Sequence, residues 1–213
     1  MEKFVPALSF NRLTVYFDVL MHTFLPEKKF KSALIEQANI QPGNRILDFG
    51  AGTATLTMMA KQQQPGADFY GVDVDPVITG IAIEKIKKAG MSIQIGLYDG
   101  ITLPYHDGFF DKVISSLTFH HLTTDQKHFS LKEIHRILKP GGELHIADWG
   151  RPQNYLMRLL FYFVQIFDGF GRTSDNVKGL LPGYIEQTGF REVKELQRFA
   201  TIVGTLTLYK GNK

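Results

Sequence analysis

The sequence predicts an α/β fold of the doubly wound type, in which a mostly parallel sheet carries helices on both faces. Two features predict it. Short apolar runs rich in β-branched residues alternate with longer amphipathic segments, and turn residues stand at the boundaries between them. Strand, helix and strand at this pitch imply right-handed crossover connections, which make neighbouring strands parallel.

Five apolar runs are the expected parallel strands, at residues 45–49, 68–73, 92–97, 111–116 and 143–148. Helical patterns lie between them at 53–64, 76–89 and 124–138. The turn QPG at 41–43 precedes the first strand, and KPGG at 139–142 ends the helix before the fifth strand. Both are natural boundaries, because proline cannot continue a helix and glycine supplies the special backbone angles of a turn.

The segments on either side of this pattern predict covers for the sheet and a closing strand pair. Residues 10–39 predict two helices broken at Pro26, and residues 155–167 predict an unusually apolar and aromatic helix. A further helix is expected at 176–189. Alternation of apolar and polar residues over 191–209 predicts an antiparallel strand pair, which brings the number of strands to about seven.

The chain has 213 residues, of which 44% are hydrophobic and 21% are charged, the balance of an ordinary globular domain. One domain is therefore expected over residues 1–213. Within it we expect an N-terminal helical cover, a ligand-binding core, a helical lid, and a last helix with the strand pair. The expected bounds of these four parts are 1–40, 41–149, 150–175 and 176–213.

Composition excludes several classes of protein and site. The chain has no cysteine, which excludes a disulfide scaffold, a thiolate zinc site, an iron–sulfur cluster and a cysteine nucleophile, and no metal is expected. The net charge of +3 is spread along the chain, so no nucleic-acid partner is expected. No run approaches the roughly 18 apolar residues of a membrane span, and the N-terminus lacks a signal-peptide pattern, so we expect a cytoplasmic location.

The motif ILDFGAGTATL, which starts at Ile46, is the sharpest chemical signal. A buried strand ends at Asp48, and Gly50 and Gly52 turn the chain into a helix, so that a ligand can approach the main chain closely. The spacing lacks the third glycine of GxGxxG. Asp48 would repel a pyrophosphate but would favour an ammonium or sulfonium group. Taken alone, the motif is also compatible with a purely structural tight turn.

Two further acids follow the next two strands. Asp73 stands 25 residues after Asp48 at the end of the second strand, where a carboxylate can accept both hydroxyls of a ribose. Asp99 follows the third strand, and Asp75 is expected to cap the next helix, with Pro76 at its first position. Because the carboxyl ends of parallel strands meet at one edge, Asp48, Asp73 and Asp99 predict a single ligand-binding crevice.

At these residues the sequence resembles the class I S-adenosylmethionine-dependent methyltransferases, and it is most similar to the small-molecule branch typified by the ubiquinone/menaquinone C-methyltransferases. The similarity runs from about residue 41 to 149 and includes ILDFGAGTATL, GVDVDP, YDGITLPYHDGFFDKVISSLTFHHL and RILKPGGELHIAD. The resemblance implies a Rossmann-like fold with a seven-stranded, mostly parallel sheet and an antiparallel C-terminal strand. It also implies S-adenosyl-L-methionine as cofactor.

The resemblance implies a role for each matching position. Asp48 is expected to hold the amino group of the cofactor, and Asp73 to bind its ribose. Val74, Asp99 and Gly100 are expected at the adenine. The remaining expected contacts lie at the methionine end, and they are Gly50, Ala51, Gly52, Ser115, Ser116 and Leu117. Ala51 and Ala54 replace a cysteine and a glycine common in the family, which predicts altered loop packing with binding retained.

A general base is needed only if the nucleophile arrives protonated. The candidates are His120 and His121, which follow the fourth strand, and Asp148, which ends the fifth. The structural alternatives are packing or helix capping for the histidines and a structural hydrogen bond near Trp149 for Asp148. These alternatives stay open at the level of sequence.

The aromatic helix at 155–167 is the best indication of the acceptor. It is expected to be a lid whose Phe161 and Phe163 line an apolar pocket, together with Tyr16 and Phe17 of the N-terminal helix. A core helix packed on the sheet is the alternative. The pocket predicts methyl transfer to carbon or oxygen of a small apolar or aromatic acceptor.

Three other functions compete with this prediction. They are a non-catalytic S-adenosylmethionine-binding protein, an RNA methyltransferase, and an NAD-dependent oxidoreductase.

Overall fold

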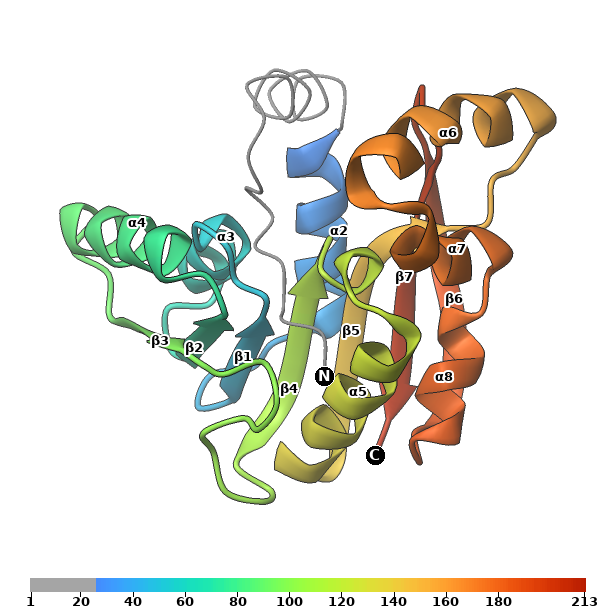
Figure 1. Cartoon of the computed structure of the whole chain (residues 1–213). Coiled ribbons are helices and arrows are strands. Elements are labelled where there is room, and N and C mark those ends of the chain that lie inside the picture. Colours follow the sequence, from blue (N-terminus) through green and yellow to red (C-terminus); the bar gives the residue numbers. More distant parts are fainter. Residues whose placement is uncertain (1–25) are drawn as a thin grey trace.

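In the computed structural model, which describes residues 26–213, seven strands form one sheet in the order β3-β2-β1-β4-β5-β7-β6 (Figure 1). Strands β1 to β5 pair in parallel, whereas β7 pairs antiparallel with both β5 and β6. The predicted doubly wound sheet with an antiparallel C-terminal strand is therefore confirmed.

The strands are β1 Arg45–Phe49, β2 Asp68–Asp73, β3 Ile93–Leu97, β4 Phe110–Ser116, β5 Leu138–Gly150, β6 Arg191–Ala200 and β7 Thr205–Asn212. The helices are α2 Glu27–Ala38, α3 Thr55–Gln63, α4 Pro76–Lys88, α5 Thr124–Ile137, α6 Tyr155–Asp168, α7 Phe170–Lys178 and α8 Leu181–Gln187. A short 3₁₀ helix, η1 Phe119–His121, follows β4.

Two elements differ from the sequence-based expectation. The helix expected at 176–189 is two helices, because Gly179 adopts a left-handed conformation at φ +72° and ends α7 before α8 begins. Strand β5 begins at Leu138 rather than at residue 143, because Leu138 already pairs with Phe110 of β4 and the KPGG residues form a bulge before Glu143 pairs with Lys112. The amide of Gly141 donates to the carbonyl of Lys213, and the amide of Lys213 donates to the carbonyl of Gly142.

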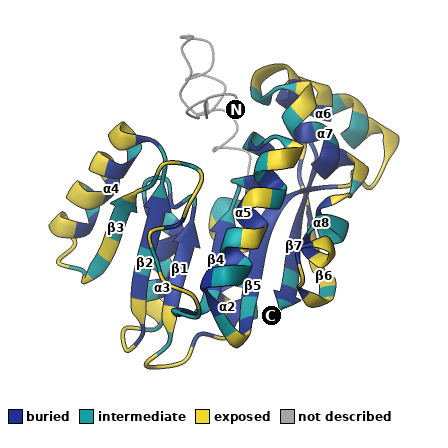
Figure 2. Cartoon of the chain, turned by 60° about the horizontal axis from the view of Figure 1, so that its bottom comes forward, coloured by how far each residue is buried: buried dark blue, intermediate teal, exposed yellow. Residues whose placement is uncertain are grey.

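Different helices bury the two faces of the sheet (Figure 2). On one face, α2, α3 and α6 pack on a cluster that includes Phe30, Leu56 and Phe161. On the other face, α5 and α8 pack on a second cluster. Neighbouring residues of β1 divide between them, with Ile46 in the first cluster and Leu47 in the second, because successive side chains of a strand point to opposite faces.

The aromatic helix α6 is two-sided, and its two predicted pocket residues lie on different sides. Phe161 is 0% exposed, and its ring packs edge-on against Trp149 at a centroid distance of 5.3 Å. Beside it, the main chain at Gly204 is so close that a Cβ atom there would lie 2.7 Å from Phe161 Cδ2. Phe161 therefore belongs to the core rather than to a pocket wall, whereas Phe163 is 57% exposed.

Because Phe161 is buried and Phe163 is exposed, we expect alanine substitutions at these two positions of α6 to destabilise the fold by different amounts. Phe161→Ala should lower the free energy of unfolding by about 3–5 kcal/mol, because it leaves a cavity in the core. The matched control, Phe163→Ala, should change it by no more than about 0.5 kcal/mol. Urea unfolding of both variants measures the difference, and equal costs would contradict the assigned orientation of α6.

Candidate active site

The predicted site residues gather at the carboxyl ends of β1, β2, β3, β4 and β5. The chain passes from β1 to β2 on one side, whereas β4 lies on the other side of β1. In open α/β sheets, the crevice at such a reversal of strand order is where ligands bind. The topology therefore places the predicted cofactor residues and the predicted catalytic residues along one edge.

The glycine loop lies directly on the end of β2. The amides of Gly50 and Ala51 both donate to the carbonyl of Val72, each at 3.0 Å. Gly50 has φ +71°, and a Cβ atom there would lie 2.4 Å from the side chain of Thr118, so only glycine fits. Ala54 has φ +59°, a conformation that glycine adopts without steric cost, and this accounts for the glycine of the family pattern.

Asp73 holds the loop against the start of α4. Its Oδ2 accepts a hydrogen bond from the amide of Gly52 at 2.9 Å, and its Oδ1 accepts one from the amide of Asp75 at 3.0 Å. Each carboxylate oxygen keeps a further lone pair, so the group can still accept two ligand hydroxyls. Asp75 caps α4 through the amides of Val77 and Ile78, as predicted.

Asp48 is more deeply buried than a residue expected to touch a ligand. It is 1% exposed, and its Oδ2 accepts a hydrogen bond of 2.6 Å from the hydroxyl of Thr57 in α3. Burial raises the pKa of Asp48 to about 6. The structure thus gives Asp48 a role in holding α3, and its contact with a cofactor ammonium group stays a prediction.

Asp99 lies at the opposite, exposed end of the crevice. Its Oδ1 accepts hydrogen bonds from the amides of Ile101 and Thr102, which lower the pKa of Asp99. The neighbouring Gly100 has φ +80° and turns the chain away from β3. A contact between Oδ2 of Asp99 and the adenine amine of the cofactor stays a prediction. Val74, next to Asp73, is partly exposed.

The end of β4 tests whether the crevice fits a polar ligand. The hydroxyl of Ser115 donates to the carbonyl of Phe49 at 2.8 Å, but the hydroxyl of Ser116 is buried and has no hydrogen-bond partner among the described residues. A buried polar atom without a partner calls for a ligand or a water. The next residue, Leu117, has φ +55°, a conformation that a non-glycine residue keeps only where the surrounding structure holds it, and such residues cluster at ligand-binding sites.

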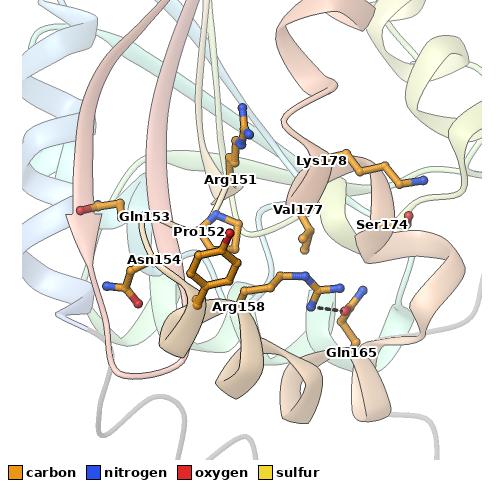
Figure 3. Close-up of a pocket in the computed structure, with 10 residues that line it drawn as sticks. Arg151, Pro152, Gln153, Asn154, Arg158, Gln165, Ser174, Val177 and Lys178 are labelled. Carbon is orange, nitrogen blue, oxygen red and sulfur yellow. Dashed lines mark hydrogen bonds between the residues drawn. The ribbon is translucent and has the colours of Figure 1, made fainter.

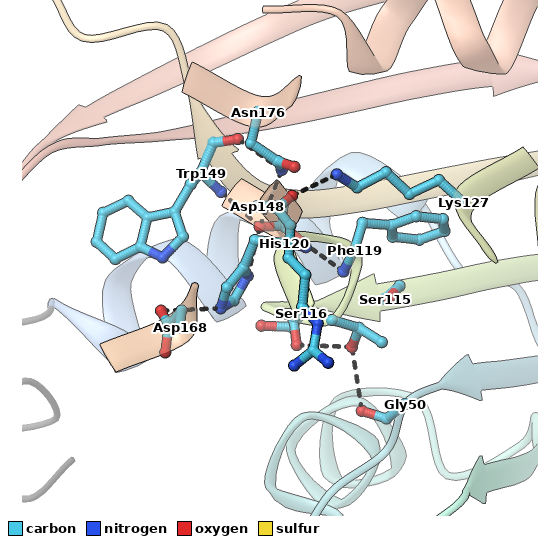
Figure 4. Close-up of polar contacts among 12 residues, drawn as sticks. Gly50, Ser115, Ser116, Phe119, His120, Lys127, Asp148, Trp149, Asp168 and Asn176 are labelled. Atoms are coloured by element: carbon cyan, nitrogen blue, oxygen red, sulfur yellow. Dashed lines mark hydrogen bonds and ion pairs between the residues drawn. The ribbon is translucent and has the colours of Figure 1, made fainter. Parts of the chain in front are cut away.

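A single buried carboxylate, that of Asp148, organises the other side of the crevice (Figure 4). Its Oδ2 accepts hydrogen bonds from the amides of Phe119 at 2.7 Å and His120 at 3.3 Å. Its Oδ1 accepts one from Nδ1 of His120 at 2.7 Å and another from the amide of Trp149 at 2.7 Å. The side chain of Asn176 in α7 donates to the same oxygen at 3.4 Å.

His120 lies between two carboxylates. Nδ1 faces Asp148, and Nε2 lies 3.7 Å from Oδ2 of Asp168 at the end of α6. Burial alone would lower the pKa of His120, but Asp148 and Asp168 together outweigh it and raise the pKa above its ordinary value. The adjacent ring of His121 is the reverse case, because burial and the charges of His120 and Arg172 hold its pKa well below the ordinary value.

Two charged residues near the His120–Asp148 pair were not predicted from the sequence. Asp168 ends an aromatic helix, and an acid in that position was the only signal of its contact with His120. Lys127 has a fully buried side chain whose ammonium group donates to Asp175 at 3.0 Å and to the carbonyl of Arg172 at 2.6 Å. This pair fixes α7 against α5. Tyr16 and Phe17, expected at the pocket mouth, lie outside the described residues.

Comparison with known proteins gives a consistent result. Residues 46–142 match a family model described as a methyltransferase domain. The demethylmenaquinone methyltransferase of Thermus thermophilus is 28% identical over 166 residues, which cover 76% of this chain and 74% of the relative. A ubiquinone/menaquinone biosynthesis C-methyltransferase of Cupriavidus metallidurans is 26% identical over 204 residues, covering 86% and 81%. An uncharacterized methyltransferase of Synechocystis sp. is 32% identical over 174 residues, covering 79% and 77%.

The fold is also shared with a solved structure. A SAM-dependent methyltransferase from Aquifex aeolicus superposes with a TM-score of 0.68 at 18% identity, and the match covers 91% of this chain and 97% of the other.

Because the pKa of Asp48 is raised, Asp48→Asn is expected to stabilise the fold by an amount that depends on pH. Since the pKa rises from 3.8 to about 6, the contribution of Asp48 to stability is fully present below 3.8 and is lost as the pH rises through about 6. Well above that pH, Asp48→Asn should raise the free energy of unfolding by on the order of 1–3 kcal/mol, and the gain should shrink toward pH 3.8.

Urea unfolding at a series of pH values measures this gain. The exposed Asp99 is the control, because its pKa is lowered and Asp99→Asn should bring no gain at high pH. If Asp48→Asn raises the free energy of unfolding by the same amount at every pH, then ionisation of the buried Asp48 carboxyl does not destabilise the fold, and the prediction is wrong.

Proposed function

Because this chain belongs to the class I S-adenosylmethionine-dependent methyltransferases, we propose that it methylates a ring carbon of a quinone-type small molecule. The observation that carries the proposal is the buried pair of His120 and Asp148, a proton acceptor at the edge of the predicted cofactor crevice. The names of two relatives, a demethylmenaquinone methyltransferase and a ubiquinone/menaquinone C-methyltransferase, support the class of acceptor.

The crevice offers a partner for each polar part of S-adenosylmethionine. Asp73 would accept the ribose hydroxyls through its remaining lone pairs, and Oδ2 of Asp99 would accept the adenine amine. The unpartnered hydroxyl of Ser116 would bind at the methionine end. When bound, S-adenosylmethionine supplies an electrophilic methyl group on a positively charged sulfur.

His120 would activate the acceptor by removing a proton. A ring carbon of a quinol becomes strongly nucleophilic when a neighbouring hydroxyl loses its proton, because the electron pair of the O–H bond moves into the ring. Asp148 holds Nδ1 of His120, which leaves Nε2 as the nitrogen that takes this proton. Asp148 also stabilises the imidazolium that forms. Alignment of the two reactants supplies the rest, since methyl transfer is an in-line displacement in which the methyl–sulfur bond would break as the bond to the ring carbon forms. The ring carbon would then release its own hydrogen to solvent as a proton, and the His120 imidazolium would return its proton to the quinol oxygen.

Calorimetry with S-adenosylmethionine, S-adenosylhomocysteine and NAD tests the cofactor site. The two sulfur compounds should bind and NAD should not. Asp73→Ala should weaken binding of both by about 1–3 kcal/mol, the usual cost of leaving such hydroxyls unpaired. The control is Asp68→Ala, at the exposed start of the same strand β2, and it should leave the affinity unchanged. Unchanged affinity in Asp73→Ala would overturn the ribose assignment.

The pH dependence of turnover tests the proton acceptor. Because the pKa of His120 is raised, the neutral base becomes available only as the pH rises above the ordinary value of 6.5, and the single-turnover rate should rise with it. Asp168→Asn removes one of the carboxylates that raise this pKa, so the rising limb should move to lower pH. Mass-spectrometric detection of the methylated product from reduced demethylmenaquinone gives the rate.

Asp125→Asn is the control for this profile, because Asp125 is exposed in the first turn of α5 and should leave the limb in place. If Asp168→Asn does not shift the rising part of the pH–rate profile, His120 is not the proton acceptor. Binding of S-adenosylmethionine with no product from any quinol would instead favour a different acceptor or a binding protein without turnover.

A further inference from the structure

The outward face of α6 is formed by large apolar side chains. Each is at least 40% exposed, and they are Tyr155, Leu156, Leu159, Phe163, Ile166 and Phe167. At 3.6 residues per turn, these six side chains fall within an arc of about 120° that contains no other residue of the helix. Phe161, Val164 and Gln165 point the opposite way and are buried. Such a face is larger than the scattered apolar residues of an ordinary protein surface.

This helix can lie on a membrane but cannot cross one. It has 14 residues, and none of the helices among residues 26–213 is long and apolar enough to span a bilayer. An amphipathic helix whose apolar arc is bounded by buried and polar residues is instead the kind that lies in the interface plane of a bilayer.

A cavity of about 430 Å³ at the start of α6 carries positive charge next to this face (Figure 3). Arg151, Arg158 and Lys178 line it, together with Gln153, Asn154 and other residues, and no acidic side chain of residues 26–213 does. The guanidinium group of Arg158 donates to the side chain of Gln165 at 2.9 Å and stacks on the ring of Tyr162 at 4.1 Å. Arg158 therefore stays at the border between the apolar face and the cavity.

We propose that the outward face of α6 and the cationic cavity together form a docking surface for a bilayer that contains anionic phospholipids. The six apolar side chains would enter the acyl-chain boundary, and Arg151, Arg158 and Lys178 would pair with lipid phosphates. Charge complementarity favours this occupant.

Docking of α6 would also place the candidate active site close to the bilayer. The same helix ends at Asp168, which faces His120 at 3.7 Å. The inference does not depend on the proposed acceptor, since it concerns a surface and is tested without S-adenosylmethionine and without any quinone.

Flotation of the full chain with lipid vesicles tests the docking surface. Vesicles of phosphatidylcholine with an equal amount of phosphatidylglycerol should bind the protein, and vesicles of phosphatidylcholine alone should bind it roughly tenfold less. The double variant Leu159→Glu with Ile166→Glu should lose roughly tenfold or more in binding. Arg151→Gln with Lys178→Gln should lose about fivefold per cation and should show a weaker salt dependence.

The control variant carries Ile83→Glu in α4, another exposed apolar residue on a different helix, and it should bind vesicles as the natural chain does. Inorganic phosphate, added at the same concentration as the lipid phosphate, should not displace the protein from the vesicles. This result distinguishes a lipid surface from a site for free phosphate. Absence of vesicle binding would overturn the proposal. So would a dimer, seen by sedimentation velocity, that the Leu159→Glu and Ile166→Glu variant dissociates, because a second copy would then cover the face.

Discussion

The carboxylate of Asp148 is the group on which the candidate active site depends. It is fully buried at the end of β5, and a buried charge is costly unless donors surround it. The donors come from three places in the chain: η1 after β4, the next amide of β5, and Asn176 of α7. One carboxylate therefore fixes the turn beside the glycine loop, the orientation of His120, and the docking of α7 on the sheet.

The helices after β5 extend this arrangement outward. Phe161 attaches α6 to Trp149, which is the residue next to Asp148, and Asp168 at the other end of α6 faces Nε2 of His120. The buried pair of Lys127 and Asp175 holds α7 in place behind them. The inner side of α6 is thus tied to the reactive histidine, while its outer side is apolar and exposed.

Local signals made the parallel core predictable from the sequence, and tertiary contacts explain what was not. The bounds of β1 and β2 follow from apolar runs between turn residues, and the cap of α4 follows from Asp75 and Pro76. The direction in which α6 turns Phe161 and Phe163 depends on packing against Trp149, which periodicity alone does not reveal. The bond between Asp48 and Thr57 and the approach of Asp168 to His120 join distant segments, so no spacing rule indicates them.

The role of Asp148 is tested most directly by an NMR titration of the His120 ring in the natural chain and in Asp148→Asn. In the natural chain we expect the ring of His120 to have a pKa above the ordinary value of 6.5, and in Asp148→Asn we expect a lower pKa, because the carboxylate charge is gone. A His120 pKa at or below 6.5 in the natural chain, or one that Asp148→Asn leaves unchanged, would contradict the claim that Asp148 charges and orients this histidine.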